Sequence, residues 1–148
     1  MKYVGALIFA VCAAALGYYK SRSLKIRAES CKNVASLALG IGSYIDKLKL
    51  PLRDIYVRLS PSNALARTLL ENGDIGELIA DDEAYERLSA FLDKIGGGFC
   101  DEELALCKEL EQFANERCEL LDKEYQSKGV LYRSLGLIVG LALLIVIA

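Results

Sequence analysis

The sequence of 148 residues contains no histidine, and its five cysteines are an odd number. Without histidine, ordinary imidazole acid–base catalysis is excluded, and so are most protein metal sites. Cys100, Cys107 and Cys118 lie seven and eleven residues apart, which matches no metal-binding pattern. We interpret the cysteines as filler in a core or a membrane, since a disulfide framework is more typical of secreted domains and a catalytic thiol would have no imidazole to activate it.

Charge is missing from two long stretches. Residues 3–19 (YVGALIFAVCAAALGYY) and 135–148 (LGLIVGLALLIVIA) contain no Asp, Glu, Lys or Arg, although charged residues make up 26% of the chain. A helix needs about 20 residues to cross the hydrocarbon core of a bilayer, and ~17 can suffice. The sequence therefore predicts transmembrane helices at 1–19 and 129–148, the second of which reaches full length if Arg133 extends to the headgroups.

The N-terminal stretch has an alternative reading as a cleaved signal peptide, given its basic start and its run of alanines. However, its apolar run is longer than a usual signal core and ends in Tyr18-Tyr19, which suit a membrane interface. The basic residues that follow resist translocation and favour an uncleaved anchor; they are Lys20, Arg22, Lys25, Arg27 and Lys32. The positive-inside rule then places residues 20–134 in the cytoplasm and both ends of the chain on the far side.

Residues 20–128 show helical spacing throughout and no strand-like alternation. One apolar row recurs every seven residues, and Arg27 interrupts a second row with the same interval. The last long helix, from about Asp101, has an inward face at intervals of three and four, and Gly129 is a candidate bend before the final anchor. The rows are Leu24, Cys31, Ala38 and Ile45; Val34, Ile41 and Leu48; and Leu104, Cys107, Leu110, Ala114, Cys118, Leu121 and Tyr125.

Helix-capping and helix-breaking residues divide the segment between the long helices. Pro51 ends the first helix and opens a short one, and Ser60-Pro61 gives a second start signal, with Ser60 as the N-cap. Asp81-Asp82-Glu83 suits the start of a helix that Gly96-Gly97-Gly98 ends. The predicted fold is all-α: a small antiparallel helical bundle (20–128) between an N-terminal and a C-terminal transmembrane helix.

Small residues recur at helical spacing within both anchors. This spacing lets two helices approach closely, so the anchors are expected to pack together or against a partner. The residues are Ala6, Ala10, Ala14 and Gly17 in the first anchor, and Gly136 and Gly140 in the second.

Charge is also divided along the chain. Residues 2–67 carry eleven basic and three acidic residues, whereas residues 71–124 carry seventeen acidic and five basic residues. The basic part suits anionic headgroups, and the acidic part suits a basic protein partner and argues against nucleic-acid binding. We hypothesise that two acidic helix starts form part of a partner dock: Asp81, Asp82 and Glu83, and Asp101, Glu102 and Glu103.

Several motifs stand out along the chain: the Met-Lys start, a Lys-x-Pro-Leu turn (Lys49, Pro51, Leu52) and the tail Arg133-Ser134-Leu135-Gly136 with Gly140 and Leu141. Together they resemble the stage III sporulation protein AB family. The chain departs from the family pattern where Ala105 stands in place of a Gln. The resemblance implies a fold similar to the cytoplasmic domain of F-type platform proteins of type II secretion and type IV pilus systems.

The resemblance also implies a role in the apparatus that joins mother cell and forespore, in the mother-cell membrane around the forespore. Its implied partners are a secretion-type ATPase, stage III sporulation protein AA, and other stage III membrane subunits; homo-oligomerisation is left open. On this reading the protein is a non-enzymatic platform subunit without cofactor or metal. The alternatives are a signalling or regulatory membrane adaptor, and a membrane-tethered hydrolase that would need a pocket lined by several carboxylates.

Overall fold

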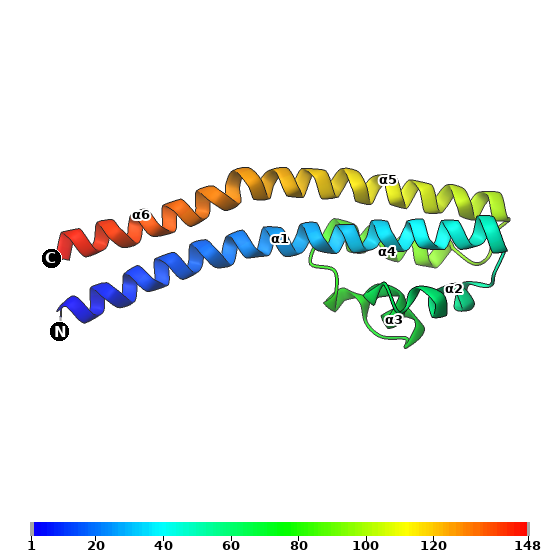
Figure 1. Cartoon of the computed structure of the whole chain (residues 1–148), viewed down its shortest axis with the longest axis horizontal. Coiled ribbons are helices and arrows are strands. Elements are labelled where there is room, and N and C mark those ends of the chain that lie inside the picture. The colour runs from blue at the N-terminus through cyan, green and yellow to red at the C-terminus, as the bar shows by residue number, and fades with distance from the viewer. Residues whose placement is uncertain (1, 148) are drawn as a thin grey trace. The chain divides into compact units, whose positions relative to one another are not determined.

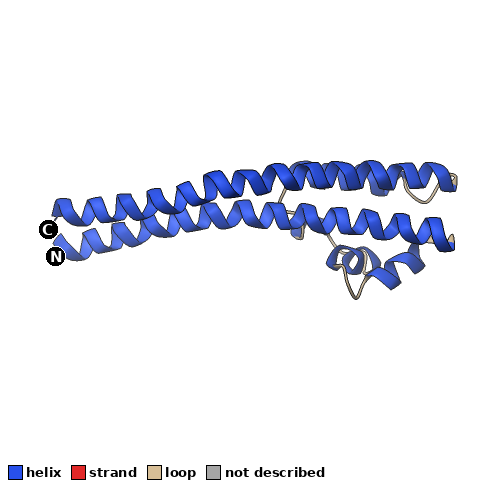
Figure 2. Cartoon of the chain, turned by 45° about the horizontal axis from the view of Figure 1, so that its top comes forward, coloured by secondary structure: helices blue, strands red, loops and turns tan. Residues whose placement is uncertain are grey.

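The computed structural model describes the backbone of residues 2–147, and their side chains except at 2–4, 6, 143, 144, 146 and 147. Residues 2–147 contain helices and no strand, which confirms the predicted all-α class (Figure 2). The chain forms two compact units: unit 1 comprises Met1–Ile26 and Leu120–Ala148, and unit 2 comprises Arg27–Glu119. The elements are α1 (Lys2–Leu48), α2 (Leu52–Leu59), α3 (Ala64–Leu70), the 3-10 turn η1 (Ile75–Glu77), α4 (Asp82–Lys94), α5 (Cys100–Glu124), the π-helical turn η2 (Tyr125–Gly129) and α6 (Val130–Ile147).

In unit 1, the first part of α1 runs antiparallel to α6 and beside it (Figure 1). We call this pair of helices the hairpin, although residues 27–119 separate its two segments in sequence. Gly136 lies against the backbone of Ala13 and Ala14, and Gly140 lies against that of Ala10. Facing positions therefore fall along α1 as they rise along α6, and the start of α1 and the end of α6 lie at the same end of unit 1.

The passage from α5 to α6 is helical but not uniformly α-helical, because η2 makes one π-helical turn. Gly129, the candidate bend, is the last residue of η2. A Cβ added at Gly129 would lie 2.9 Å from Cδ2 of Tyr125 and 3.1 Å from Oγ of Ser21 on α1. A glycine at this position thus lets η2 pack directly on Ser21.

The predicted inward faces of the two long helices form much of the core of unit 2. Leu104 is half-buried, and Leu48 is 52% exposed because it is the last residue of α1. In unit 1, Leu24 and Leu121 are buried as well. The buried residues of the predicted rows in unit 2 are Cys31, Val34, Ala38, Ile41 and Ile45 on α1, and Cys107, Leu110, Ala114 and Cys118 on α5.

Asn63 starts α3, so the predicted cap at Ser60 is wrong. The Asn63 side chain accepts hydrogen bonds from the N–H groups of Leu65 (2.9 Å) and Ala66 (3.3 Å). Its amide nitrogen donates to the carbonyl oxygen of Asn33 on α1 at 3.1 Å, so the same side chain caps α3 and ties it to α1. Ser60 instead ends α2, and Pro61 lies in the turn that follows.

The ends of α4 follow the predicted signals. Asp81 caps its N-terminus by accepting from the N–H of Ala84, and the helix ends at Lys94, two residues before Gly96. Gly96 has φ +97°, in the left-handed region that glycine adopts without a Cβ penalty. Pro51 similarly precedes α2 in an extended conformation, as a residue at a helix boundary should.

Candidate membrane and docking surfaces

The small residues predicted to pack the anchors form the interface of unit 1. A Cβ on Gly17 would collide with the carbonyl oxygen of Tyr132, and one on Gly136 would lie 2.9 Å from that of Ala13. The two backbones are therefore in direct contact, as small residues permit in membrane helix pairs. Ala10, Ala14 and Gly140 line a groove of about 210 Å³ along this interface. The side chain of Ala6 lies outside the described residues.

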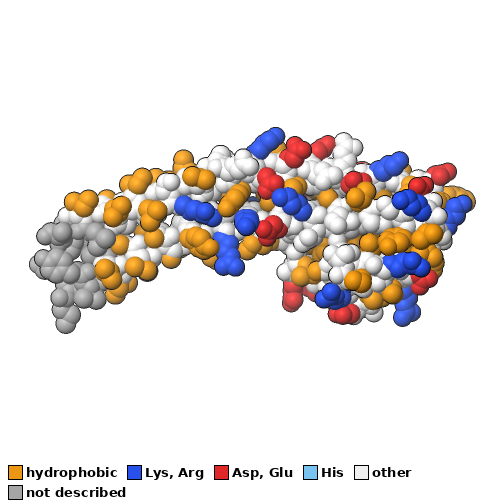
Figure 3. Space-filling model, in the orientation of Figure 1, with side chains coloured by type: hydrophobic (Ala, Val, Ile, Leu, Met, Phe, Trp, Pro, Cys, Tyr) orange, Lys and Arg blue, Asp and Glu red, His pale blue; other side chains and the backbone are white. Residues whose placement is uncertain are grey.

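The outward surface of unit 1 is apolar over most of α6 and the first part of α1 (Figure 3). Phe9 is 71% exposed, Leu16 is 70% exposed and Ile145 is 76% exposed. Extended apolar surface of this kind is characteristic of a site that contacts membrane or other protein. It also includes Leu7, Ile8, Val11, Leu135, Leu137, Ile138 and Leu141.

Spanning length is a separate question from apolar surface. Where side chains are described, no helix combines sufficient length with sufficient apolar character to cross a membrane. Both predicted transmembrane segments, 1–19 and 129–148, include residues whose side chains lie outside that part of the chain.

Basic residues border the apolar surface of unit 1. Apart from Lys2, the charged residues of this unit lie in 20–25 and 122–133, which the contact between Ser21 and Gly129 brings to one level of the hairpin. Unit 1 has seven basic and two acidic residues, whereas unit 2 has eleven basic and eighteen acidic residues. Of the residues predicted for the membrane surface, Lys20, Arg22, Lys25 and Arg133 are exposed in unit 1, and Lys32 is exposed in unit 2.

Arg133 is held at this border by two tyrosines. Its guanidinium carbon lies 5.6 Å from the ring centroid of Tyr18 and 5.9 Å from that of Tyr125, and Nη2 donates to the Tyr125 hydroxyl at 3.1 Å. Each such cation–π contact is worth ~0.5–1 kcal/mol at an exposed site. Tyr18 and Tyr19 are 56% and 73% exposed, so amphipathic rings lie where the apolar surface meets the charged residues.

Unit 2 contains a fully buried carboxylate, Asp81, at 0% exposure. Its Oδ1 accepts from Nη2 of Arg27 at 2.6 Å, and its Oδ2 accepts from Nε of Arg117 at 3.0 Å and from the Ala84 N–H at 3.3 Å. Arg117 also pairs with Glu83 at 2.9 Å. Because Arg27 is on α1 and Arg117 is on α5, this cluster fixes the start of α4 against both long helices.

The two arginines keep Asp81 ionised. Burial alone would raise the pKa of Asp81, but the hydrogen bonds from Arg117, Arg27 and Ala84 outweigh it and hold the pKa below its ordinary value of 3.8. The bond to Asp81 correspondingly raises the pKa of Arg117. The arrangement joins three elements and suits a structural role.

Arg27 and Arg117 are the residues that the sequence pattern did not connect with Asp81. Arg27, expected at the membrane surface, directs its guanidinium to Asp81, 54 positions away, and its side chain is 33% exposed. A signal existed for Arg27: it lies seven residues before Val34 in an apolar row, and a charge on an inward face needs a partner. Arg117 sits beside the inward face of α5 and offers no comparable signal.

The two acidic helix starts form separate surfaces. Asp82 and Glu83 lie in the first turn of α4, and Asp101 and Glu102 lie in the first turn of α5, beyond the other end of α4. The 13 residues of α4 span about 20 Å at ~1.5 Å per residue. These four side chains are exposed, whereas the carboxylate of Asp81 is buried and cannot meet a docking partner. Glu103 is half-buried and accepts a hydrogen bond from the N–H of Gly96.

The thiols of the core are strongly shifted away from reactivity. Burial, reinforced by Asp81, raises the pKa of Cys31 to about 12, and burial with Glu103 and Glu111 raises that of Cys107 to about 11. A thiol with such a pKa is protonated at neutral pH and is a poor nucleophile. These two cysteines therefore act as apolar packing groups.

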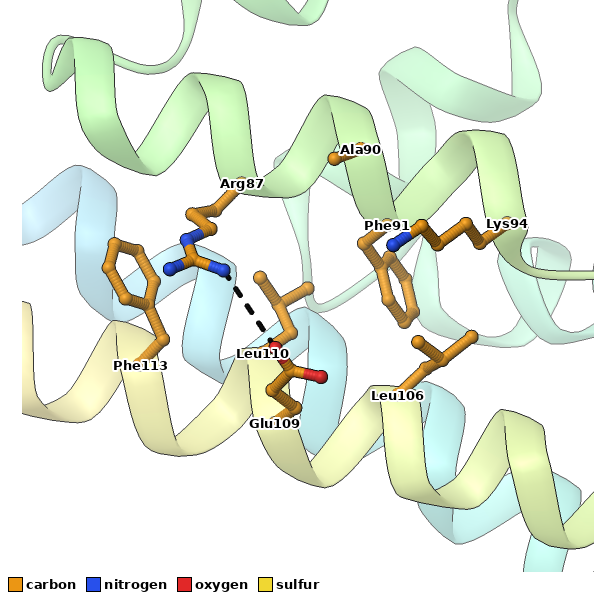
Figure 4. Close-up of a pocket in the computed structure, with 8 residues that line it drawn as sticks. All are labelled: Arg87, Ala90, Phe91, Lys94, Leu106, Glu109, Leu110 and Phe113. Atoms are coloured by element: carbon orange, nitrogen blue, oxygen red, sulfur yellow. Dashed lines mark ion pairs between the residues drawn. The ribbon is translucent and has the colours of Figure 1, made fainter.

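The grooves of unit 2 are small. Between α4 and α5, a groove of about 60 Å³ has buried Phe91 and Leu110 among its lining residues, and Arg87 lies 5.0 Å from the Phe113 ring centroid and 3.8 Å from a carboxylate oxygen of Glu109 (Figure 4). Small-molecule pockets usually enclose ~300–1,000 Å³.

A second groove, between α1 and α5, has a volume of about 240 Å³. The hydrolase alternative requires several carboxylates in one pocket. One carboxylate, that of Glu109, lines the α4–α5 groove. Two carboxylates line the second groove: Asp46, which is next to Lys47 in sequence, and Glu111, which follows Lys108 by three residues.

The described structure thus combines an apolar helical hairpin bordered by basic residues with an acidic helical bundle. No family model, characterised protein or solved structure matches the chain. The resemblance to stage III sporulation protein AB stays a prediction from its sequence motifs.

Proposed function

We propose that the protein is a non-catalytic membrane platform subunit of the stage III sporulation protein AB type. In this proposal, unit 1 is the membrane anchor, and unit 2 is a cytoplasmic domain that docks a secretion-type ATPase. The observation that carries the proposal is the division of surface character between the units: one exposes large apolar side chains, and the other is helical, acidic and built around its own core.

The hairpin of unit 1 suits a two-pass anchor. Its small residues face each other, so its large apolar side chains face outward, where lipid would cover them. Helices satisfy their backbone hydrogen bonds internally, as a hydrocarbon environment demands. Tyr18, Arg133 and the exposed lysines would lie at the headgroups of one leaflet, and the positive-inside rule makes this the cytoplasmic leaflet.

The acidic surface of unit 2 suits a basic protein partner. Eighteen acidic residues against eleven basic ones would speed the approach of a positively charged surface and disfavour an acidic one. The resemblance implies that this partner is stage III sporulation protein AA, in the mother-cell membrane around the forespore. Residues of α1 belong to both units, and in this proposal the anchor helices transmit or brace the motion of the docked ATPase.

Charge reversal tests the dock. We expect that at least one of two double variants, Asp82→Lys/Glu86→Lys and Asp101→Lys/Glu102→Lys, weakens ATPase binding by about tenfold or more, since opposed like charges suppress association. Glu86 is an exposed residue of the same helix and takes the place of Glu83 in the first variant, because Glu83 pairs with Arg117. The matched control is Glu71→Lys/Glu116→Lys, which makes the same charge change at two exposed positions outside both helix starts. Binding is measured by interferometry on the full chain in nanodiscs, with far-UV circular dichroism as the folding check.

Wild-type affinity in both test variants would contradict the proposed dock. A wild-type protein that ignores the ATPase but binds another soluble protein would instead identify the signalling or regulatory adaptor.

A further inference from the structure

We infer that the turn between α4 and α5 makes the central contact of this dock, with Phe99 as its anchoring side chain. The inference rests on the proposed function and adds the place and chemistry of the contact. Its occupant is a protein surface that is basic and contains an apolar pocket for one aromatic ring.

Phe99 is the most exposed large apolar side chain described in unit 2. It is 81% exposed, and the next in this unit are Leu39 at 54% and Leu48 at 52%. The other phenylalanines of unit 2 belong to the bundle: Phe91 is 5% exposed and Phe113 is half-buried. A ring left in water forgoes a large gain from burial, and a partner's pocket would supply it.

The turn that presents Phe99 is held in place although it contains three glycines. Glu103 fixes both of its sides: its carboxylate accepts from the N–H of Gly96 at 2.9 Å, and its own N–H donates to the carbonyl oxygen of Phe99 at 3.0 Å. A contact residue that is already ordered loses less conformational entropy on binding. The backbone that carries Phe99 is therefore held in place before any partner binds.

The charges around Phe99 select the partner. Asp101 and Glu102 follow it directly and are both exposed. Gly96 lies 3.8 Å from Leu52 at the start of α2, measured from an added Cβ, so the turn borders the connection from α1, where Leu48 adds apolar surface. An aromatic ring flanked by carboxylates suits a basic protein surface, whereas an anionic membrane would repel the same carboxylates.

The test compares Phe99→Ala with Val57→Ala, which shortens a less exposed apolar side chain of unit 2. Both full-length variants are placed in nanodiscs, and their affinity for the purified ATPase is measured. We expect Phe99→Ala to bind at least about tenfold more weakly, mainly through faster dissociation, as for a hot-spot residue. We expect Val57→Ala to bind as the wild type does, and Asp101→Asn/Glu102→Gln to slow association and flatten its salt dependence.

The sequence contains no tryptophan, so Phe99→Trp provides a conservative replacement and introduces the one tryptophan of the chain, which can be excited apart from its eight tyrosines. This variant should keep most of the affinity, and brominated lipids in the nanodisc should leave its fluorescence unquenched. Quenching would place the side chain in the membrane and overturn the inference.

Equal binding by Phe99→Ala and the wild type would overturn the inference while leaving the proposed function intact. A wild-type protein that does not bind the ATPase would overturn the proposed function, and this inference with it.

Discussion

Among single residues, Asp81 makes the most consequential contacts described in unit 2. A buried carboxylate is costly unless it is paired and hydrogen-bonded, and here two arginines and a backbone N–H supply five donated hydrogen bonds. Its partners come from α1, α4 and α5, so one side chain joins the helices on which the bundle depends. Asp81 therefore belongs to the fold and is not available to the proposed dock.

Replacement of this carboxylate should destabilise the bundle. We expect Asp81→Asn to lower the free energy of unfolding by about 2–4 kcal/mol, near the range for breaking a buried ion pair and reduced because both arginines reach some solvent. Denaturant unfolding of the full chain in detergent, followed by circular dichroism, measures the effect. The control is Asp82→Asn at the exposed neighbouring position.

The same comparison should depend on pH with a definite sign. Because the folded-state pKa of Asp81 is lowered, its contribution is fully present above the ordinary value of 3.8 and is lost as pH falls through the folded-state pKa. The stability difference between wild type and Asp81→Asn should thus be constant from neutral pH down to about 5 and shrink only under strong acid. A difference that vanishes near neutral pH would show that the carboxylate is not held by the arginines.

Among the elements, α1 and α6 show how small residues set the distance between two helices. Gly17 and Gly136 leave no room for a methyl group, because the facing atoms are backbone carbonyls that cannot rotate away. Gly5 on the same helix has nothing within 4 Å of an added Cβ. Substitution at Gly17 and Gly136 therefore tests close packing, and substitution at Gly5 measures the general effect of a glycine on helix stability.

We expect Gly17→Ala/Gly136→Ala to destabilise the hairpin by about 1–3 kcal/mol, since overpacking outweighs the gain in helix propensity. Gly5→Ala should be neutral or slightly stabilising. Thermal unfolding in detergent micelles measures both variants. Equal melting temperatures for the double variant and the wild type would mean that the two backbones do not touch.

Sequence periodicity predicted the long helices and most of their inward faces, because apolar spacing at threes and fours is a local property. It did not predict contacts that depend on distant residues. The start of α3 was placed at Ser60, whereas Asn63 caps the helix and also donates to Asn33. Asp81 was included in the dock as part of an acidic helix start. Its pairing with two arginines was not predicted, because they lie 54 and 36 positions away. The π-helical turn at Tyr125–Gly129 was expected only as a bend at Gly129.

Over the whole molecule, the chain separates apolar surface from acidic surface. Unit 1 exposes large apolar side chains and carries seven basic residues against two acidic ones, and unit 2 reverses this charge balance. A platform subunit needs both properties, one for lipid and one for a soluble partner. We propose that the membrane surface lies at the basic residues of unit 1.

Topology tests this central claim most directly. A single cysteine is added after Ala148 in a background in which the five native cysteines are replaced, and a membrane-impermeant thiol reagent is applied from each side of the membrane. The control keeps only native Cys100, which is part-exposed at the start of α5 and should react from the cytoplasmic side alone. Two crossings predict that the added cysteine reacts from the far side only; labelling from the cytoplasmic side would contradict the two-pass anchor and remove the main support for the platform proposal.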